Sequence, residues 1–470
     1  MRKLPANYQK ISTGGAVLLA AIAHAPAQQQ PFMQAGTGQP PLLPKLAAAS
    51  PATSASTNAW EGFFNGQIPE AIARGKLNVN VRLRYEQADE EGIKAITKDS
   101  YAPTIRTRFG YTTESLYGFQ GMLEGVNVSV LGPEHNYNAA GSNGQGARPV
   151  VPDPPLTRLD QAWLAYNYTN WISAKVGEQQ INLDNQRFVG DSGWWQNMQT
   201  FDTASVSSEP LKGLNLDYGY LWEVHRIYGD VSGLPAANTD FDSKSHLINV
   251  SYSGWKYGRF VGYTYLLDLK NAAGAANSCA TYGGYFAGNA PVSDKISVDY
   301  RAEFAWQTQY GDSLLKYGTE YYNLEGGMSL RPFAFGAGYE DLGSGSNTGA
   351  GGGRVGFRTP LATLHTFDGW DNVFLTTPGD GLHDLYGYAQ VTLPAQIPVR
   401  FVYHKFDAAY GDGNYGQEFD FIASKKLGKY WNASVEYAYY QGQDAAAGSF
   451  LATANNVDVQ KVWAQVEFIF

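Results

Sequence analysis

The chain has 470 residues, of which 16% are charged and 14% aromatic, and it contains 53 glycines and 32 tyrosines. This composition excludes collagen-like, coiled-coil and disordered proteins. The single cysteine, Cys279, excludes an internal disulfide framework and any multi-cysteine metal site. No run of 18 apolar residues occurs beyond the N-terminus, which excludes a protein that crosses a membrane with helices.

The first 27 residues have the pattern of a secretory signal peptide. Arg2, Lys3 and Lys10 precede an apolar stretch from residue 11 to 23, and Ala-Pro-Ala at 25–27 forms a small-x-small cleavage site. Without these residues, 31 basic residues stand against 43 acidic ones, a net charge of −12. So acidic a chain is a poor binder of nucleic acid, and we expect no nucleic-acid partner.

Residues 28–58 are rich in Gln, Pro, Ala, Ser and Thr, which predicts a low-complexity linker in the periplasm. The apolar residues of the segment that follows, Phe63, Phe64, Ile68, Ala71 and Ile72, can lie on one side of a short helix. The alternative is an ordered lead-in to the first strand. We therefore divide the chain into a signal peptide (1–27), a linker with a short N-terminal segment (28–75) and one domain (76–470).

From Lys76 onward, apolar and polar residues alternate with a period of two. In the segment KLNVNVRLRYE, Leu77, Val79 and Val81 alternate with asparagines and arginines, and the last residues alternate in the same way up to Phe470. On a β-strand these two sets face opposite sides. A soluble β-sandwich also alternates, but here the strands are long, and Tyr and Trp recur near their ends, as in the aromatic girdle of a membrane barrel. We predict an all-β, antiparallel transmembrane β-barrel in the bacterial outer membrane, in contact with its lipid.

The alternating segments give a count of 18 strands, with 16 as the alternative. The weakest segment, 278–288, is retained because a barrel with both ends in the periplasm needs an even number of strands. Short connections then fall on one side and long ones, including 183–197 and 343–382, on the other. The predicted strands are 76–87, 101–112, 121–131, 158–169, 172–182, 198–208, 213–224, 244–253, 257–268, 278–288, 295–309, 316–330, 333–342, 383–393, 397–408, 415–426, 430–442 and 457–470.

The polar positions of these strands predict a lumen of mixed charge. Four arginines fall on the first two strands, and Lys461 joins them because a closed barrel pairs its last strand with its first. One interpretation is a set of ion pairs that stiffens the wall; the other is a cationic stripe that guides an anionic solute. The basic positions are Arg82, Arg84, Arg106, Arg108, Lys175, Arg301, Arg400 and Lys461, and the acidic ones are Glu86, Asp217, Glu223, Asp299, Glu303, Glu320, Glu436 and Glu467.

The sequence carries no recognisable catalytic constellation. The seven histidines share no metal-ligand spacing, and no GxSxG, HExxH or Walker-type loop occurs. His404 and Arg400 share a face, but such a pair is more often a hydrogen-bonding pair of the wall. We expect no enzymatic activity, no cofactor and no metal.

Two long connections contain large apolar side chains that are costly to leave in water. We predict that these loops, 183–197 and 343–382, fold inward and narrow the outer mouth; the alternative is an apolar knot on the rim. The lid residues are Arg187, Phe188, Trp194, Trp195, Leu361, Leu364, Phe367 and Trp370.

Several segments together resemble the alginate-export family of outer-membrane barrels. They are LNVNVRLRYEQ, VGEQQINLDNQRFVGDSGWWQNMQTFD, GFRTPLATLHTFDGWDNVFLTTPGDGLHDLY and DFIASKKLGKYWNASVEYAYY. The resemblance implies an 18-stranded passive channel that exports an anionic polysaccharide such as alginate, together with periplasmic export partners. The mixed lumen departs from the cationic bore of that family. The alternative is therefore a general or solute-specific porin for small hydrophilic molecules.

Overall fold

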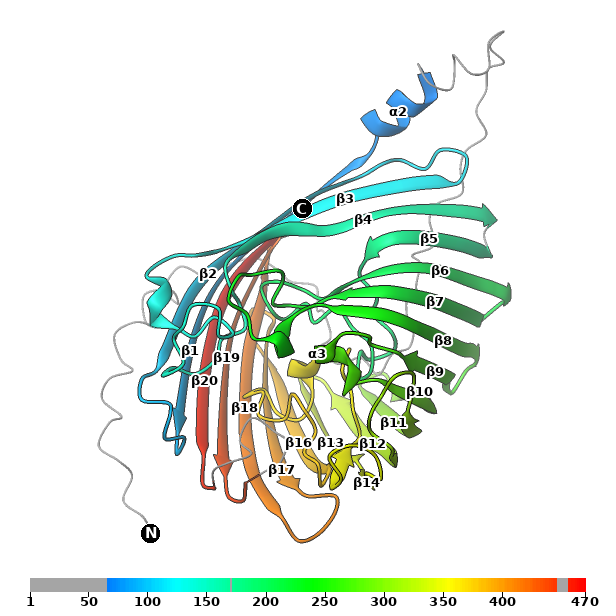
Figure 1. Ribbon diagram of the computed structural model, residues 1–470. Coiled ribbons are helices and arrows are strands. Elements are labelled where there is room, and N and C mark those ends of the chain that lie inside the picture. The colour runs from blue at the N-terminus through cyan, green and yellow to red at the C-terminus, as the bar shows by residue number, and fades with distance from the viewer. Residues whose placement is uncertain (1–65, 170, 446–454) are drawn as a thin grey trace.

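The chain folds into a closed antiparallel β-barrel (Figure 1). The computed structural model describes residues 66–169, 171–445 and 455–470, and within these ranges eighteen strands form one sheet. Strand β1 (Lys76–Glu91) pairs with both β2 (Ser100–Thr112) and β20 (Asp458–Ile469), so the sheet has no free edge. Reciprocal backbone hydrogen bonds between Val79 and Phe470 extend this seam to the last residue. The predicted fold class and strand count are confirmed.

All eighteen predicted strands are present, with ends shifted by a few residues. The segment that alternates poorly is β10, which pairs with both of its neighbours over most of its length. The remaining barrel strands are β3 (Phe119–Val130), β4 (Leu156–Thr169), β5 (Ile172–Gln179), β6 (Thr200–Leu211), β7 (Leu214–His225), β8 (Phe241–Trp255), β9 (Gly258–Leu267), β10 (Cys279–Ser293), β11 (Ile296–Gln309), β12 (Gly318–Leu330), β13 (Phe333–Leu342), β16 (Leu382–Leu393), β17 (Ile397–Asp407), β18 (Asn414–Leu427) and β19 (Trp431–Gly442).

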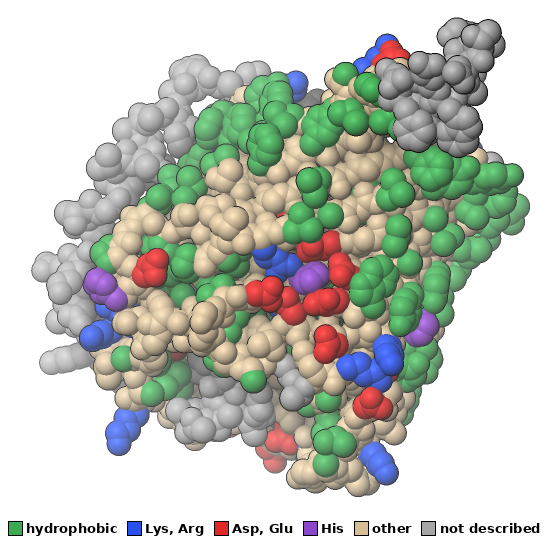
Figure 2. Space-filling model, turned by 45° about the horizontal axis from the view of Figure 1, so that its top comes forward, with side chains coloured by type: hydrophobic (Ala, Val, Ile, Leu, Met, Phe, Trp, Pro, Cys, Tyr) green, Lys and Arg blue, Asp and Glu red, His purple; other side chains and the backbone are tan. Residues whose placement is uncertain are grey.

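The two faces of the wall differ as the alternation predicts. Outward side chains such as Leu83 and Phe401 are exposed, whereas their strand neighbours, Arg82 and Arg84 or Arg400 and Val402, are buried in the lumen. Figure 2 shows hydrophobic side chains along the flank, while charged side chains gather near the middle of the drawn face. A closed barrel with an apolar outer surface is the architecture of bacterial outer-membrane proteins, in agreement with the predicted localisation.

Two acidic residues predicted to face the lumen do not. Glu320 is exposed, because Thr319 and Tyr321 on either side of it point inward. Glu223 follows a β-bulge at which the register shifts between Leu221 and Glu223. The extra residue reverses the alternation, so that Val224 points inward and Glu223 outward.

The hydrophobic core lies inside the barrel, where loops fill the lumen. Phe188 and Leu361 from two different loops pack with inward wall residues such as Tyr263 and Tyr321. Before β1, the short helix α2 (Ile68–Ala73) occupies part of the predicted N-terminal segment. The predicted signal peptide and most of the predicted linker lie outside the described residues. Among the described residues, no helix is long and apolar enough to span a membrane.

Candidate functional site: a lumen narrowed by two loops

Two connections cross the inside of the barrel and bind to each other. We call residues 180–199, between β5 and β6, the first inner loop, and residues 343–381, between β13 and β16, the second inner loop. The Gly190 amide donates a hydrogen bond to the Leu361 carbonyl (2.8 Å), and the Thr363 amide donates to the Gln186 carbonyl (3.0 Å). The second inner loop contains a small hairpin of β14 (Ser344–Ser346) and β15 (Arg354–Gly356). The two loops therefore form one inner layer.

The first inner loop is held by the arginines of β1 and β2. The Arg82 guanidinium donates to the carbonyls of Gly193 (3.1 Å) and Trp194 (2.9 Å). Arg84 also donates to the Trp194 carbonyl (2.5 Å), and its guanidinium lies 4.3 Å from the centre of the Trp194 ring. Because Arg82 and Arg84 lie near the middle of β1, the loop lies deep in the lumen rather than on the rim.

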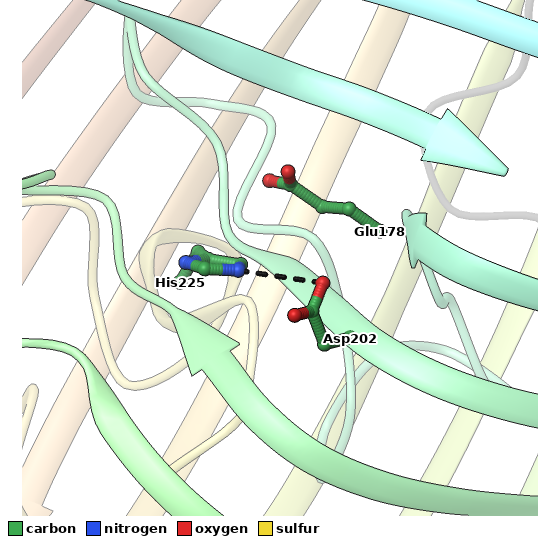
Figure 3. Close-up of side chains that lie close together, drawn as sticks. All are labelled: Glu178, Asp202 and His225. Atoms are coloured by element: carbon green, nitrogen blue, oxygen red, sulfur yellow. Dashed lines mark ion pairs between the residues drawn. The ribbon is translucent and has the colours of Figure 1, made fainter.

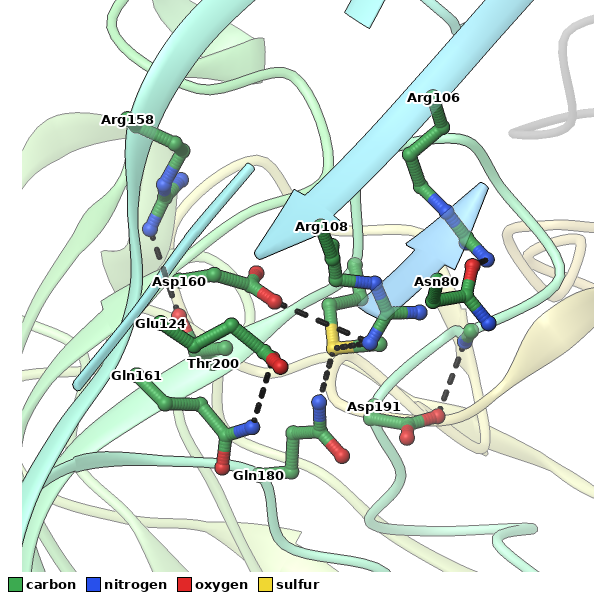
Figure 4. Close-up of polar contacts among 12 residues, drawn as sticks. Asn80, Arg106, Arg108, Glu124, Arg158, Asp160, Gln161, Gln180, Asp191 and Thr200 are labelled. Atoms are coloured by element: carbon green, nitrogen blue, oxygen red, sulfur yellow. Dashed lines mark hydrogen bonds and ion pairs between the residues drawn. The ribbon is translucent and has the colours of Figure 1, made fainter. Parts of the chain in front are cut away.

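The same arginines are partly neutralised by acidic neighbours. Arg106 donates to Glu467 (2.7 Å) and to Asn80 (2.6 Å), and Arg108 lies 3.8 Å from Asp160 (Figure 4). Arg82 forms an ion pair with the same carboxylate, that of Glu467, at 3.1 Å. These arginines therefore form ion pairs with wall acids, as the first of the two interpretations expects, and they also position a loop. The guidance of an anionic solute stays a prediction.

Arg187, at the tip of the first inner loop, connects both loops to the opposite wall. Its guanidinium donates to Glu340 of β13 (2.6 Å) and to Asp368 of the second inner loop (2.8 Å), and the side chain is fully buried. Burial alone lowers the pKa of Arg187, but the adjacent carboxylates of Asp368 and Glu340 outweigh it and raise the pKa above its ordinary value. The group therefore remains a cation at every working pH.

The second inner loop is anchored to the wall at β18 and β20. The Asp371 amide donates to Glu418 (2.7 Å), and the Lys461 ammonium donates to the Asp371 carbonyl (2.5 Å). His365 stacks face to face on Trp194 at 4.1 Å, and one ring nitrogen contacts Asn372 (3.0 Å). Burial lowers the pKa of His365 well below its ordinary value. A neutral imidazole is therefore part of the contact between the loops.

On the side of the short turns, the inner layer borders a cavity of about 670 Å³. Its wall includes Arg301, Arg400 and Lys426, and Arg400 lies 3.9 Å from the centre of the Tyr388 ring. Several of its carboxylates are paired: Glu467 with Arg82, Asp384 with His404 (2.8 Å), and Glu340 and Asp368 with Arg187. Arg301 is also paired, with Glu303 (2.6 Å). The cavity thus has polar walls of mixed charge, with a basic stretch formed by Arg400 and Lys426.

The positions of the predicted site residues follow from these contacts. Arg82, Arg301 and Arg400 line the cavity, together with Trp194, Phe367 and Trp370. The inner layer itself contains Arg187, Phe188, Trp195 and Leu364. It is held from the wall by Arg84, Arg106, Arg108 and Lys461. Whether these residues bind a solute stays a prediction. Glu340, Asp368 and His365 were missed, although Glu340 lies at an inward position of the alternating segment 333–342.

No protein-family model and no curated protein matches the chain. Solved structures do resemble it. Pseudomonas aeruginosa OpdK with vanillate has a TM-score of 0.60 at 12% identity, covering 84% of this chain and 98% of that one. Acinetobacter baumannii OccAB2 has a TM-score of 0.63 at 11% identity, covering 85% and 99%. P. aeruginosa OpdQ has a TM-score of 0.57 at 15% identity, covering 86% and 100%. At these identities the likeness establishes the fold.

The resemblance to the alginate-export family is wrong. The structures that the barrel resembles are porins of the Occ and Opd type, which are also 18-stranded, and not alginate exporters. The strand number is shared by both types of barrel and does not separate them. The predicted export partners depended on that resemblance and lose their basis with it.

Proposed function

We propose that this chain is a passive channel for small hydrophilic solutes. The observation that carries the proposal is the inner layer: two hydrogen-bonded loops cross the lumen and leave beside them a cavity of about 670 Å³. A cavity of that size suits a single small molecule. A polysaccharide chain requires a continuous path, which the contacts of Arg187 and Trp194 with the wall interrupt.

The basic stretch of the cavity favours solutes that carry a carboxylate. Arg400 and Lys426 come from the adjacent strands β17 and β18, whereas Arg301 of β11 is already paired with Glu303 (2.6 Å). The stacking of Arg400 on Tyr388 leaves the planar guanidinium next to an aromatic face, which suits an aromatic carboxylate. OpdK, whose structure contains vanillate, is consistent with a ligand of this class.

Reversal potentials across a planar bilayer under a salt gradient test this proposal. Arg400→Gln and Lys426→Gln are expected to lower the permeability ratio of anion to cation, because each removes a positive charge from the cavity. Lys295→Gln is the matched control, since Lys295 is an exposed lysine in the short turn between β10 and β11. An unchanged ratio in both cavity variants would contradict an anion preference, and liposome swelling with neutral sugars of increasing size tests the size limit separately.

A further inference from the structure

Three side chains that can bind a metal converge on the outer face of the barrel, at the end that carries the long loops. Glu178 ends β5, Asp202 begins β6 and His225 ends β7. Glu178 lies directly opposite Asp202 in the sheet, and His225 lies opposite Thr200, one diagonal step from Asp202. Figure 3 shows the three side chains pointing toward a common space.

The β-bulge of β7 places this group outside the lumen. Val224 is fully buried in the inner core, so His225 points to the other face. Asp202 follows the buried Phe201 and accepts a hydrogen bond from the exposed indole of Trp222 (3.2 Å). The group therefore lies on the outer side of the wall, next to the strand ends at which the first inner loop leaves β5 and joins β6.

The carboxylate of Asp240 contacts the imidazole of His225 at the ring nitrogen that does not face Asp202. Its Nδ1 lies 3.2 Å from Oδ2 of Asp240, whose other oxygen accepts the Arg226 amide (2.6 Å). A carboxylate at one ring nitrogen fixes the orientation of a metal-binding histidine and makes the other nitrogen a better ligand. When Nδ1 donates to Asp240, the lone pair of Nε2 faces the carboxylate of Asp202.

The spacing between the ligand atoms fits a shared cation better than direct hydrogen bonds. His225 Nε2 lies 3.5 Å from Asp202 Oδ1, longer than an ordinary hydrogen bond. Two ligands of one tetrahedral zinc ion lie roughly 3.3 Å apart, given bonds of about 2.0–2.1 Å. One ligand atom each of Glu178, Asp202 and His225 lies within 4.8 Å of the other two.

The local charge also favours a cation. Glu223 and Asp240 add two more carboxylates around His225, at 3.9 and 3.2 Å from its Nδ1. The nearest counter-charge is Arg158, which binds one oxygen of Glu178 at 3.1 Å. The same oxygen accepts the Thr200 hydroxyl (2.6 Å), which leaves the second oxygen of Glu178 as the candidate ligand among the described residues.

We propose that Glu178, Asp202 and His225 form a binding site for one divalent transition-metal ion of the zinc class on the outer rim, with Asp240 as a positioning residue. Mixed nitrogen and carboxylate ligands suit such an ion, and three protein ligands leave a fourth position for water. The three ligands come from three strands, which explains why no sequence spacing reveals the site.

Calorimetric titration of the full-length protein with zinc tests this site. The protein is prepared in detergent without a polyhistidine tag and is stripped of metal with a chelator. One saturable site is expected, absent in His225→Gln and Asp202→Asn and roughly 10–100-fold weaker in Asp240→Asn. His246→Gln is the matched control. The His246 ring lies 2.9 Å from the Tyr218 hydroxyl and contacts no carboxylate among the described residues. It should bind zinc like the wild type.

Every variant is first checked for heat-modifiable gel mobility, so that loss of binding is read only from folded barrels. A wild-type protein with no saturable zinc site would overturn the proposal, and so would a folded His225→Gln variant that binds like the wild type. Because the site lies outside the lumen, bilayer conductance should not change with zinc. Failure here therefore leaves the proposed channel function untouched.

Discussion

Arg187 is a single side chain on which the position of both inner loops depends. Its replacement by Gln leaves the buried carboxylates of Glu340 and Asp368 without their cation. Removal of one partner from a buried pair costs about 3–5 kcal/mol. We expect Arg187→Gln to lower the urea midpoint of the barrel and to increase channel noise. Arg74→Gln is the control: its ion pair with Glu70 in α2 is exposed and lies away from both inner loops, so the expected loss is about 0–1 kcal/mol.

His365 makes the packing of the loops sensitive to pH. Burial lowers its pKa well below 6.5, with smaller contributions from Arg84 and Lys461, while the contact with Asn372 opposes the shift. Glu436, 3.5 Å away, is the nearest carboxylate. The unfolded chain takes up a proton near pH 6.5 but the folded chain does not, so the contribution of His365 is present above that pH. Below it, about 1.4 kcal/mol is lost per pH unit. Conductance should therefore rise between pH 7 and pH 5; a His365→Gln variant with the same pH response would rule His365 out.

At the scale of the element, the second inner loop supplies as many side chains to the apolar filling of the lumen as the first inner loop does. It contributes Phe357, Leu361, Val373 and Phe374 to the inner core. Deletion of residues 346–378 should raise single-channel conductance, since the strands pair independently of the loop. Deletion of residues 230–237, in the outer connection between β7 and β8, is the control and should leave conductance unchanged. Equal conductance of the two deletion variants would argue against a constriction.

The strands could be predicted from the sequence wherever the pattern that specifies them lies within the strand itself. Alternation of apolar and polar residues over a long enough segment identifies a membrane strand, and it involves only residues that are close in sequence. In β10 the signal is weak because glycines replace side chains: a Cβ on Gly283 would lie 2.5 Å from the Tyr263 hydroxyl of the adjacent strand. The bulge in β7 depends on pairing with β6 and β8, so the outward position of Glu223 could not be read from its own strand.

At the scale of the whole molecule, closure of the barrel was predictable and the contents of the lumen were not. Parity and turn length restrict the strand number. The inner layer, in contrast, consists of contacts such as Arg187 to Glu340, 153 residues apart, that no local pattern encodes. The family resemblance failed for a related reason: features common to 18-stranded barrels describe the wall, whereas solute specificity depends on the loops inside it.

Permeation through the whole barrel should reveal what the four arginines of β1 and β2 do. The sequence leaves two interpretations of Arg82, Arg84, Arg106 and Arg108: ion pairs that stiffen the wall, or attraction of an anion if one passes. In the structure, the first two also hold the carbonyls of the first inner loop, and Glu467 neutralises part of the patch. Changing all four to Gln should therefore raise conductance by releasing the loop, as well as lower the anion-to-cation permeability ratio. Both quantities come from one bilayer recording. An unchanged conductance would show that the loop is held without them, and an unchanged ratio would show that the patch does not attract the permeating anion.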